Sequence, residues 1–256
     1  MDVVVLVKDV PNPAGTPPEV GADHRQRREE PGGGLDPADE PGLEVAVRLV
    51  EQDGGSVTAV SMGPAQAARA CRRALALGAD EAVLVEDDAL RGADALVTAR
   101  VLAHAIRTLR CDLVLAGVES ADGATGAVPG ALAELLDLPA VTFARRVEIA
   151  GDRLVAERQT SAGYDVVACA LPALVTLTAA AAEARHPSVR DTMAARKKPM
   201  RTLSLEELGV ARADVSATHR VVAIEIAPER EAGEVVGEAE GADRIVELLG
   251  RMEVLG

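Results

Sequence analysis

The first half of the chain alternates short apolar runs with longer segments whose apolar residues recur at helical spacing. Unbroken β-branched content predicts a buried strand at Val3–Val7. Apolar residues at helical spacing predict a helix over Leu43–Gln52. The same alternation predicts strands at Val57–Met62, Ala82–Val85 and Leu113–Ala116, and helices at Ala65–Leu77, Ala93–Leu109 and Gly126–Leu136. Strands that alternate with helices of this length predict βαβ units and a parallel sheet.

The pattern changes after Pro139, where it predicts antiparallel strands that extend the same sheet. Val141–Ile149 and Leu154–Gln159 flank a stretch, residues 150–153, that is typical of a hairpin turn. We also expect strands at Val166–Leu171, Ala173–Thr178 and Val221–Ile226, a long loop over Asn12–Pro41, an acidic linker over Glu229–Gly241 and a terminal helix at Ala242–Leu249. The predicted fold is α/β, a Rossmann-like, doubly wound, mainly parallel sheet with an antiparallel extension and a C-terminal arm.

Composition excludes several classes of function. The chain has 27 Lys and Arg against 41 Asp and Glu, and its net charge of -14 would repel a nucleic-acid backbone. Aromatic residues make up 1%, too few for base stacking. The three cysteines form no CxxC pair and the four histidines lack ligand spacing, so we expect no metal site. Without a basic leader or a long apolar run, we expect reduced thiols, a cytoplasmic location and no membrane insertion.

The loops after the strands are the candidate ligand sites, because open α/β sheets bind ligands at the carboxyl ends of their strands. The loop Gly117–Gly126 follows a buried strand and leads into a helix. Its glycines let the backbone approach a phosphate, and the helix offers free N–H groups. The spacing is neither a Walker A loop nor GxGxxG, and no lysine is present, so a phosphate site and an ordinary βα loop both stay open. Lys8-Asp9 and Ser61–Pro64 leave the same two interpretations open.

One segment reverses the local charge of this acidic chain. Val189 and Met193 precede a basic cluster in Arg185–Pro199, which fits either a partner-docking loop or a solvated linker to the arm. The sequence contains no GxSxG or HExxH motif. No acid/base pair stands out among the many Asp and Glu residues, so we assign no catalytic residue.

Several short stretches, in their order along the chain, are more specific than any one motif. They are Val7–Pro11, Asp36–Glu40, Val60–Gln66, Ala74–Asp80, Gly117–Gly126, Glu134–Pro139, Leu171–Thr176 and Met193–Pro199. Together they resemble the beta subunit of electron-transfer flavoproteins over nearly the whole chain. The resemblance implies a heterodimer with a larger alpha subunit, which holds most of the FAD. The pair would accept electrons from acyl-CoA or related dehydrogenases, as in fatty acid oxidation, and pass them to a membrane quinone reductase or another acceptor.

The resemblance also implies binding residues and domains. The beta subunit of this family usually binds AMP, and the contacts would fall on Leu6, Asp36, Pro37, Ala38, Asp39, Met62, Gly117, Val118, Glu119, Ser120, Ala121, Asp122, Gly123, Ala124, Thr125, Gly126, Ala127 and Val128. A recognition loop would dock the dehydrogenase through His186, Val189, Met193, Arg196 and Lys197. Residues 1–200 would form the nucleotide-binding α/β domain, and residues 201–256 would form an arm that packs on the partner subunit.

The chain also differs from the family pattern near the nucleotide. Asp36 stands where the family often has Asn, and Val118-Glu119 stand where it has Arg or Lys followed by Gln. Ala124 and Ala127 replace a common Asp and Gln. Three alternative functions stay open beside this resemblance: an electron-bifurcating subunit with its own FAD and NAD site, an ATP-binding stress-type homodimer, and a small α/β enzyme.

Overall fold

The computed structural model describes residues 1–11, 20–27, 32–225, 233 and 235–252. The chain divides into two compact units, Met1–Val221 and Val222–Gly256, which are described separately. We predicted a boundary after residue 200, whereas the first unit continues for some twenty residues beyond it. Residues 12–19 and 28–31 of the predicted loop Asn12–Pro41, and residues 229–232 and 234 of the predicted linker Glu229–Gly241, lie outside the described residues. The described part of the loop includes the short strand Gly34–Leu35 and the start of a helix at Glu40, and the end of the linker belongs to a helix that begins at Glu238.

A nine-stranded sheet forms the centre of the first unit, in the order β11-β5-β4-β1-β6-β10-β7-β8-β9. Its strands are β1 (Asp2–Leu6), β4 (Ser56–Met62), β5 (Glu81–Val85), β6 (Leu113–Gly117), β7 (Ala140–Ala150), β8 (Arg153–Thr160), β9 (Gly163–Ala170), β10 (Ala173–Leu177) and β11 (Met200–Leu203). The pairs from β11 to β7 are parallel, and those of β7 with β8 and of β8 with β9 are antiparallel. The predicted α/β fold is confirmed. Strands β2 (Asp9–Val10) and β3 (Gly34–Leu35) form a separate antiparallel pair.

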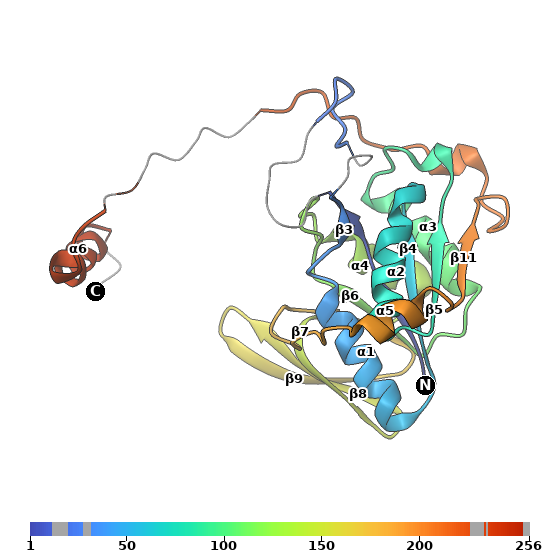
Figure 1. Ribbon diagram of the computed structural model, residues 1–256, viewed down its shortest axis with the longest axis horizontal. Helices are drawn as coiled ribbons and strands as arrows, with labels where there is room; N and C mark the ends of the chain where they lie inside the picture. Colours follow the sequence, from blue (N-terminus) through green and yellow to red (C-terminus); the bar gives the residue numbers. More distant parts are fainter. Residues whose placement is uncertain (12–19, 28–31, 226–232, 234, 253–256) are drawn as a thin grey trace. The chain divides into compact units, whose positions relative to one another are not determined.

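Helices cover both faces of the sheet (Figure 1). Strand β1 is apolar throughout its buried length because it faces a core on each side: Val3 and Val5 pack in one core, Val4 and Leu6 in the other. Helices α1 (Glu40–Asp53), α2 (Ala68–Ala76) and α5 (Val189–Ala195) supply the first core. The second core lies under α3 (Ala95–Arg107) and α4 (Ala127–Leu136). Short 3-10 turns lie at η1 (Ala65–Ala67), η2 (Asp88–Leu90) and η3 (Arg212–Val215).

The antiparallel prediction is wrong for β10. All five of its residues are buried, and it lies inside the sheet, parallel to both β6 and β7. Only Leu171 and Pro172 separate β9 from β10. Strand β9 has the direction of β7, since each is antiparallel to β8, so the chain enters β10 without reversing. The antiparallel extension therefore consists of β8 and β9, added to the long strand β7.

The C-terminal part of the chain departs from prediction in three places. Helix α5 and the edge strand β11 were not predicted, and β11 pairs with β5 from Met200↔Ala82 to Leu203↔Val85. The strand expected at Val221–Ile226 is absent from its described residues, 221–225, and Ile226 is not described. The expected terminal helix is confirmed as α6 (Glu238–Arg251) in the second unit. None of the helices in the described ranges combines the length and the apolar character needed to cross a bilayer.

The strand order sets the position of the ligand crevice. From β1 the chain passes to β4 and β5 on one side, and then returns to β6 on the other side of β1. The topological switch point therefore lies between the carboxyl ends of β1 and β6, where open α/β sheets bind ligands. Lys8 follows β1, and the loop 118–126 follows β6.

Candidate functional site at the switch point

The backbone of Lys8 holds the segment that precedes α1. Its N–H donates to Asp39 Oδ2 at 2.8 Å, and its carbonyl accepts the N–H of Asp36 at 2.9 Å. Asp36 continues this contact across the crevice, because its Oδ2 accepts the N–H of Ala121 at 2.8 Å. The segments predicted to share a site, Asp36–Asp39 and Gly117–Val128, are thus brought together by β1 and β6.

The absence of a side chain at Gly117 permits this contact. A Cβ built at Gly117 would lie 2.9 Å from the carbonyl oxygen of Ala38 and 3.0 Å from Asp39 Oδ1. Real Cβ atoms essentially never approach a backbone oxygen within 3.0 Å. Glycine is therefore required at this position, because the end of β6 packs closely against the backbone of the segment before α1.

The lysine side chain closes the loop from the other side. Lys8 Nζ donates to Ser120 Oγ at 2.9 Å and forms an ion pair with Asp122 Oδ1 at 2.5 Å. The Asp122 side chain is only 4% exposed, whereas that of Lys8 is 37% exposed. Sequence reasoning left Lys8 ambiguous, and its position directly after β1 was the signal that it faces the crevice.

Helix α4 presents its amino-terminal end at this crevice. Its N-cap is Gly126, with φ of 58°, and no side chain accepts a hydrogen bond at this cap. The residues just before and at the helix start, Gly123, Ala124, Thr125, Gly126 and Ala127, are exposed. An uncapped helix start offers backbone N–H groups and a positive dipole end to an anion. The geometry fits a phosphate group.

Most acidic side chains of this region are buried or bonded to other groups of the protein. Asp36 is fully buried, and its two carboxylate oxygens accept the backbone N–H groups of Ala38 and Ala121. Burial and the neighbouring Asp36 raise the pKa of Asp39 well above its usual value. Asp122 faces Lys8, and only Glu119 is exposed to solvent. The departure from the family pattern at Asp36 is therefore structural and does not place a free carboxylate in the crevice.

The remaining predicted nucleotide contacts lie at the ends of the neighbouring strands and loops. Leu6 and Met62 are the last residues of the neighbouring strands β1 and β4, and both side chains belong to the core under α3 and α4. Pro37 is exposed beside Asp36, and Val118 and Val128 are half-buried at the two ends of the loop.

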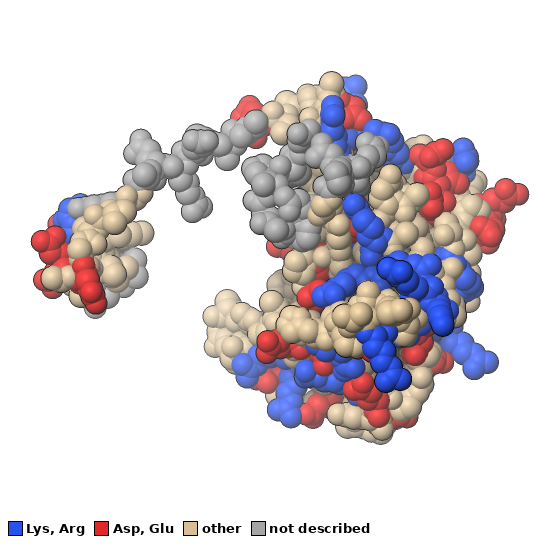
Figure 2. Space-filling view, viewed as in Figure 1, with Lys and Arg blue, Asp and Glu red and all other residues tan. Residues whose placement is uncertain are grey.

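The predicted docking segment forms a separate surface built on α5. Ser188 and Asp191 make a reciprocal capping box that starts the helix. Val189 and Met193, one helical turn apart, are 80% and 64% exposed. Figure 2 shows Lys and Arg side chains gathered around α5 and the adjoining α2. The exposed residues of this region include the predicted His186, Arg196 and Lys197, together with Arg72 and Arg190.

Charged side chains anchor both ends of α5. Before the helix, Arg185 pairs with Glu44 at 2.8 Å and with Glu51 at 2.8 Å, both on α1. After the helix, Lys198 Nζ donates to the carbonyls of Leu75 at 3.1 Å and Ala79 at 2.7 Å, at the end of α2. The exposed apolar side chains therefore sit on a helix whose position is fixed by the body of the protein.

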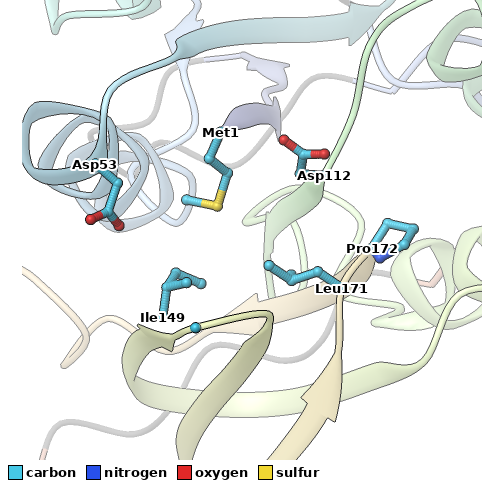
Figure 3. A pocket seen from close by; sticks show the side chains of 7 residues that line it. Met1, Asp53, Asp112, Ile149, Leu171 and Pro172 are labelled. Atoms are coloured by element: carbon cyan, nitrogen blue, oxygen red, sulfur yellow. The ribbon is translucent and has the colours of Figure 1, made fainter.

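An open cavity of about 460 Å³ lies at the opposite end of the sheet (Figure 3). It is lined by Met1, Asp53, Asp112, Ile149, Gly151, Leu171 and Pro172. Met1, Asp112 and Pro172 directly precede β1, β6 and β10, which places the cavity at the amino ends of these strands. It is therefore distinct from the switch-point crevice.

Comparison with known proteins shows the family to which the chain belongs. A family model described as "Electron transfer flavoprotein domain" matches residues 27–208. A Mycobacterium tuberculosis protein named electron transfer flavoprotein subunit beta is 37% identical over 264 residues, covering 99% of each chain. Proteins of the same name from Thermoanaerobacterium thermosaccharolyticum and Bacillus subtilis are also 37% identical, covering 100% of both chains and 84% and 85% respectively. The chain belongs to the electron transfer flavoprotein family, among its beta subunits.

Proposed function

We propose that this chain forms a heterodimer with an electron-transfer flavoprotein alpha subunit and that the pair carries electrons on an FAD held mainly by the alpha subunit. The name shared by the relatives, subunit beta, supports a partner subunit. When bound, the flavin supplies the redox chemistry, and this chain supplies binding and docking surfaces. The proposed location is cytoplasmic.

The proposed occupant of the switch-point crevice is AMP. The observation that carries this proposal is the uncapped start of α4 beside the loop that Lys8 and Asp36 hold in place. The phosphate would bind the backbone N–H groups at the start of α4, residues 126–128. The Asp36–Asp39 segment, with Leu6 and Met62, would border the rest of the nucleotide. AMP would have a structural role here, as the family resemblance implies.

The proposed electron donors are acyl-CoA or related dehydrogenases, which would dock on α5. Val189 and Met193 offer apolar surface in a basic surround, on a helix anchored at both ends. A membrane quinone reductase or another acceptor would then receive the electrons. The second unit would pack on the alpha subunit, because its helix α6 exposes Ile245, Val246 and Leu248.

Expression with and without the alpha subunit tests this function. The chain alone should be colourless, and co-expression with the alpha subunit encoded in the same genome should give a yellow 1:1 complex. Flavin bound by the isolated chain would instead favour a bifurcating subunit with its own FAD. A colourless homodimer that binds ATP would contradict the proposal. The family match argues against that homodimer and against a small α/β enzyme.

A further inference from the structure

The chain contains one phenylalanine and one tyrosine, and both side chains reach solvent. Phe143 on β7 is 46% exposed, and Tyr164 on β9 is 54% exposed. Ala144, the neighbour of Phe143, pairs with Arg158, and Tyr164 pairs with Gln159. Both aromatic residues therefore lie towards the hairpin that joins β8 to β9. Exposed aromatic side chains are enriched where proteins bind one another.

The backbone at Phe143 has a conformation that rarely holds a large side chain. Its φ is 58°, in the left-handed region, where a bulky residue is an outlier. The pairing register of β10 with β7 shifts between Val175 and Leu177, and the N–H of Phe143 donates to the buried hydroxyl of Thr176 at 2.9 Å. Bulges redirect side chains, and strained residues that the surrounding structure supports gather at functional sites. This conformation therefore marks Phe143 as a candidate contact residue.

The charges beside the aromatic residues are compensated within the chain. The Arg145 guanidinium lies 3.8 Å from the ring centroid of Tyr164, and its Nη2 donates to Glu157 at 2.6 Å. Val166 is 75% exposed, pairs with Glu157, and lies on the same face of β9 as Tyr164. Residues 160–163 of the hairpin are uncharged, and Figure 2 shows no charged side chain at its projecting end. The surface therefore combines apolar and aromatic side chains with a paired charge.

This composition differs from that of the surface on α5. Permanent interfaces are hydrophobic and poor in charge at their centre, whereas exposed charges steer transient encounters. Arg190, Arg196 and Lys197 around α5 are exposed and suit a transient donor. The surface near the β8–β9 hairpin suits a permanent partner, and the name shared by the relatives, subunit beta, supports a partner subunit.

We propose that the surface formed by Phe143, Arg145, Tyr164 and Val166 binds the alpha subunit and that the Thr176 hydroxyl positions Phe143 for this contact. The inference rests on the proposed heterodimer and adds to it a part of the first unit that holds the partner. The matching surface of the alpha subunit should be apolar and carry no excess charge. Thr176 is a positioning residue, because it acts through the backbone of Phe143.

Subunit exchange in the co-purified complex tests this surface. Complexes of wild-type or variant chain are mixed with an excess of fluorescently labelled wild-type chain, and the rate of label uptake gives the dissociation rate. Phe143→Asn and Tyr164→Ala should each raise this rate by at least about tenfold, because loss of an aromatic anchor acts mainly on dissociation. Leu96→Ala is the matched control, since Leu96 on α3 is 41% exposed and lies outside the surface. It should change the rate by less than about twofold.

Two substitutions separate contact from folding. Asparagine tolerates the left-handed conformation better than phenylalanine, so the isolated Phe143→Asn chain should unfold within about 3 °C of the wild type. Thr176→Val keeps the side-chain shape but removes the acceptor for the Phe143 N–H, and it should raise the exchange rate by at least about threefold. The double variant should exchange about as fast as Phe143→Asn alone, because both changes act through one side chain. Increases that multiply would show that Thr176 does not act through Phe143.

The remaining outcomes decide between partners. Exchange rates within about twofold of the wild type in both Phe143→Asn and Tyr164→Ala would overturn the proposal. Self-association of the isolated chain that Phe143→Asn abolishes would assign the surface to a second copy. Unchanged exchange with slower flavin reduction would assign it to the dehydrogenase. Either result would also overturn the proposal.

Two further results keep the test decisive. If Phe143→Asn does not fold, Tyr164→Ala decides alone, since Tyr164 lies on the edge strand β9. If the wild-type chain forms no complex with the alpha subunit, the proposed function fails together with this inference. If the complex forms and the variants exchange like the wild type, only this inference fails.

Discussion

Asp36 and Ala121 are joined across the switch point by a hydrogen bond of 2.8 Å from the backbone N–H of Ala121 to Asp36 Oδ2. The second oxygen of the same carboxylate accepts the N–H of Ala38 at 3.0 Å. A carboxylate suits this position because both of its oxygens accept hydrogen bonds. One buried side chain therefore ties the loop after β6 to the segment before α1.

The loss in free energy of unfolding caused by an Asp36 substitution should depend on how many accepting oxygens the new side chain keeps. Asp36→Ala leaves two backbone N–H groups without this acceptor and should lower the free energy of unfolding by about 2–4 kcal/mol. Asp36→Asn keeps one accepting oxygen and should cost about half as much. Urea denaturation of both variants checks the ranking. Equal stability of Asp36→Ala and the wild type would show that these bonds contribute nothing.

Two glycines near each other in sequence should respond to alanine in opposite directions. Gly117→Ala would place a Cβ 2.9 Å from the Ala38 carbonyl oxygen, so it should cost about 1–3 kcal/mol and weaken AMP binding. Gly130 lies within α4, and no atom lies within 4 Å of its built Cβ. Gly130→Ala should therefore stabilise the protein by up to about 1 kcal/mol. Thermal unfolding of the two variants measures whether each change lowers or raises stability. A Gly117→Ala variant as stable as the wild type would contradict the close approach.

The exposed apolar residues of α5 should matter for docking and not for folding. Val189→Asp should leave the free energy of unfolding within about 0.5 kcal/mol of the wild type, because the side chain is 80% exposed. It should slow electron acceptance from the physiological dehydrogenase by at least about tenfold. Ala194→Asp is the control, since it puts the same charge on α5 roughly 140° around the helix. Stopped-flow reduction of the flavin measures the rates, and similar slowing by both variants would refute specific docking through Val189.

The anchor of α5 should depend on pH. Burial alone would raise the pKa of Glu44, but hydrogen bonds from Arg185 and Arg48 outweigh it, and the pKa lies below its usual value. A carboxyl group whose pKa is lower in the folded state stabilises the fold above its unfolded pKa, near 4.3, and loses this contribution as pH falls through the folded value.

Arg185→Gln should therefore cost about 1–2 kcal/mol at pH 7, a value reduced by the partial exposure of the arginine. The difference from the wild type should shrink as the pH falls from about 5 towards 3. Denaturant titrations across this range test the sign. A constant difference would show that Arg185 acts through packing and not through the ion pairs.

Asp94 should hold the segment around Thr218 in place and should also cap the start of α3. Its Oδ1 accepts the N–H of Val97 at 2.9 Å, and its Oδ2 accepts both the N–H and the hydroxyl of Thr218 at 2.7 Å. The bond from Val97 lowers the pKa of Asp94 strongly, and the bonds from Thr218 add to this effect. The carboxylate is therefore ionised at neutral pH.

Asp94→Ser should separate the two roles, because serine is a good N-cap but is too short to reach Thr218. It should keep helix stability while Asp94→Ala loses about 1 kcal/mol. In both variants the amide of Thr218 should exchange with deuterium faster. If this amide stays protected from exchange in either variant, contacts other than those with Asp94 hold the segment around Thr218.

The regular βαβ part of the fold could be predicted from the sequence because its strands are apolar on both faces and its helices have one apolar face. The direction of β10 could not be inferred from its place after a hairpin. Its unbroken apolar run, Ala173–Leu177, was the better signal, since buried parallel strands read this way. Helix α5 has seven residues, too few for a clear period, although Ser188 and Asp191 stand at capping-box spacing. Strand β11 is short, and both Arg201 and Thr202 are exposed.

The candidate site was predictable as a loop but not as a set of contacts. Glycine content and position after a strand indicated Gly117–Gly126, since these are local properties. The partners of Asp36 and Lys8 lie 85 and 114 residues away in sequence, at Ala121 and Asp122. Such pairs depend on strand order, which brings β1 beside β6. No local pattern distinguishes a carboxylate that binds backbone N–H groups from one that faces a ligand.

Native mass spectrometry of the complex co-expressed with its alpha subunit tests the central claim most directly. We expect one copy of each subunit with one FAD and one AMP, and loss of the flavin when the subunits are separated. A homodimer of this chain, or a heterodimer whose flavin stays with this chain after separation, would contradict it.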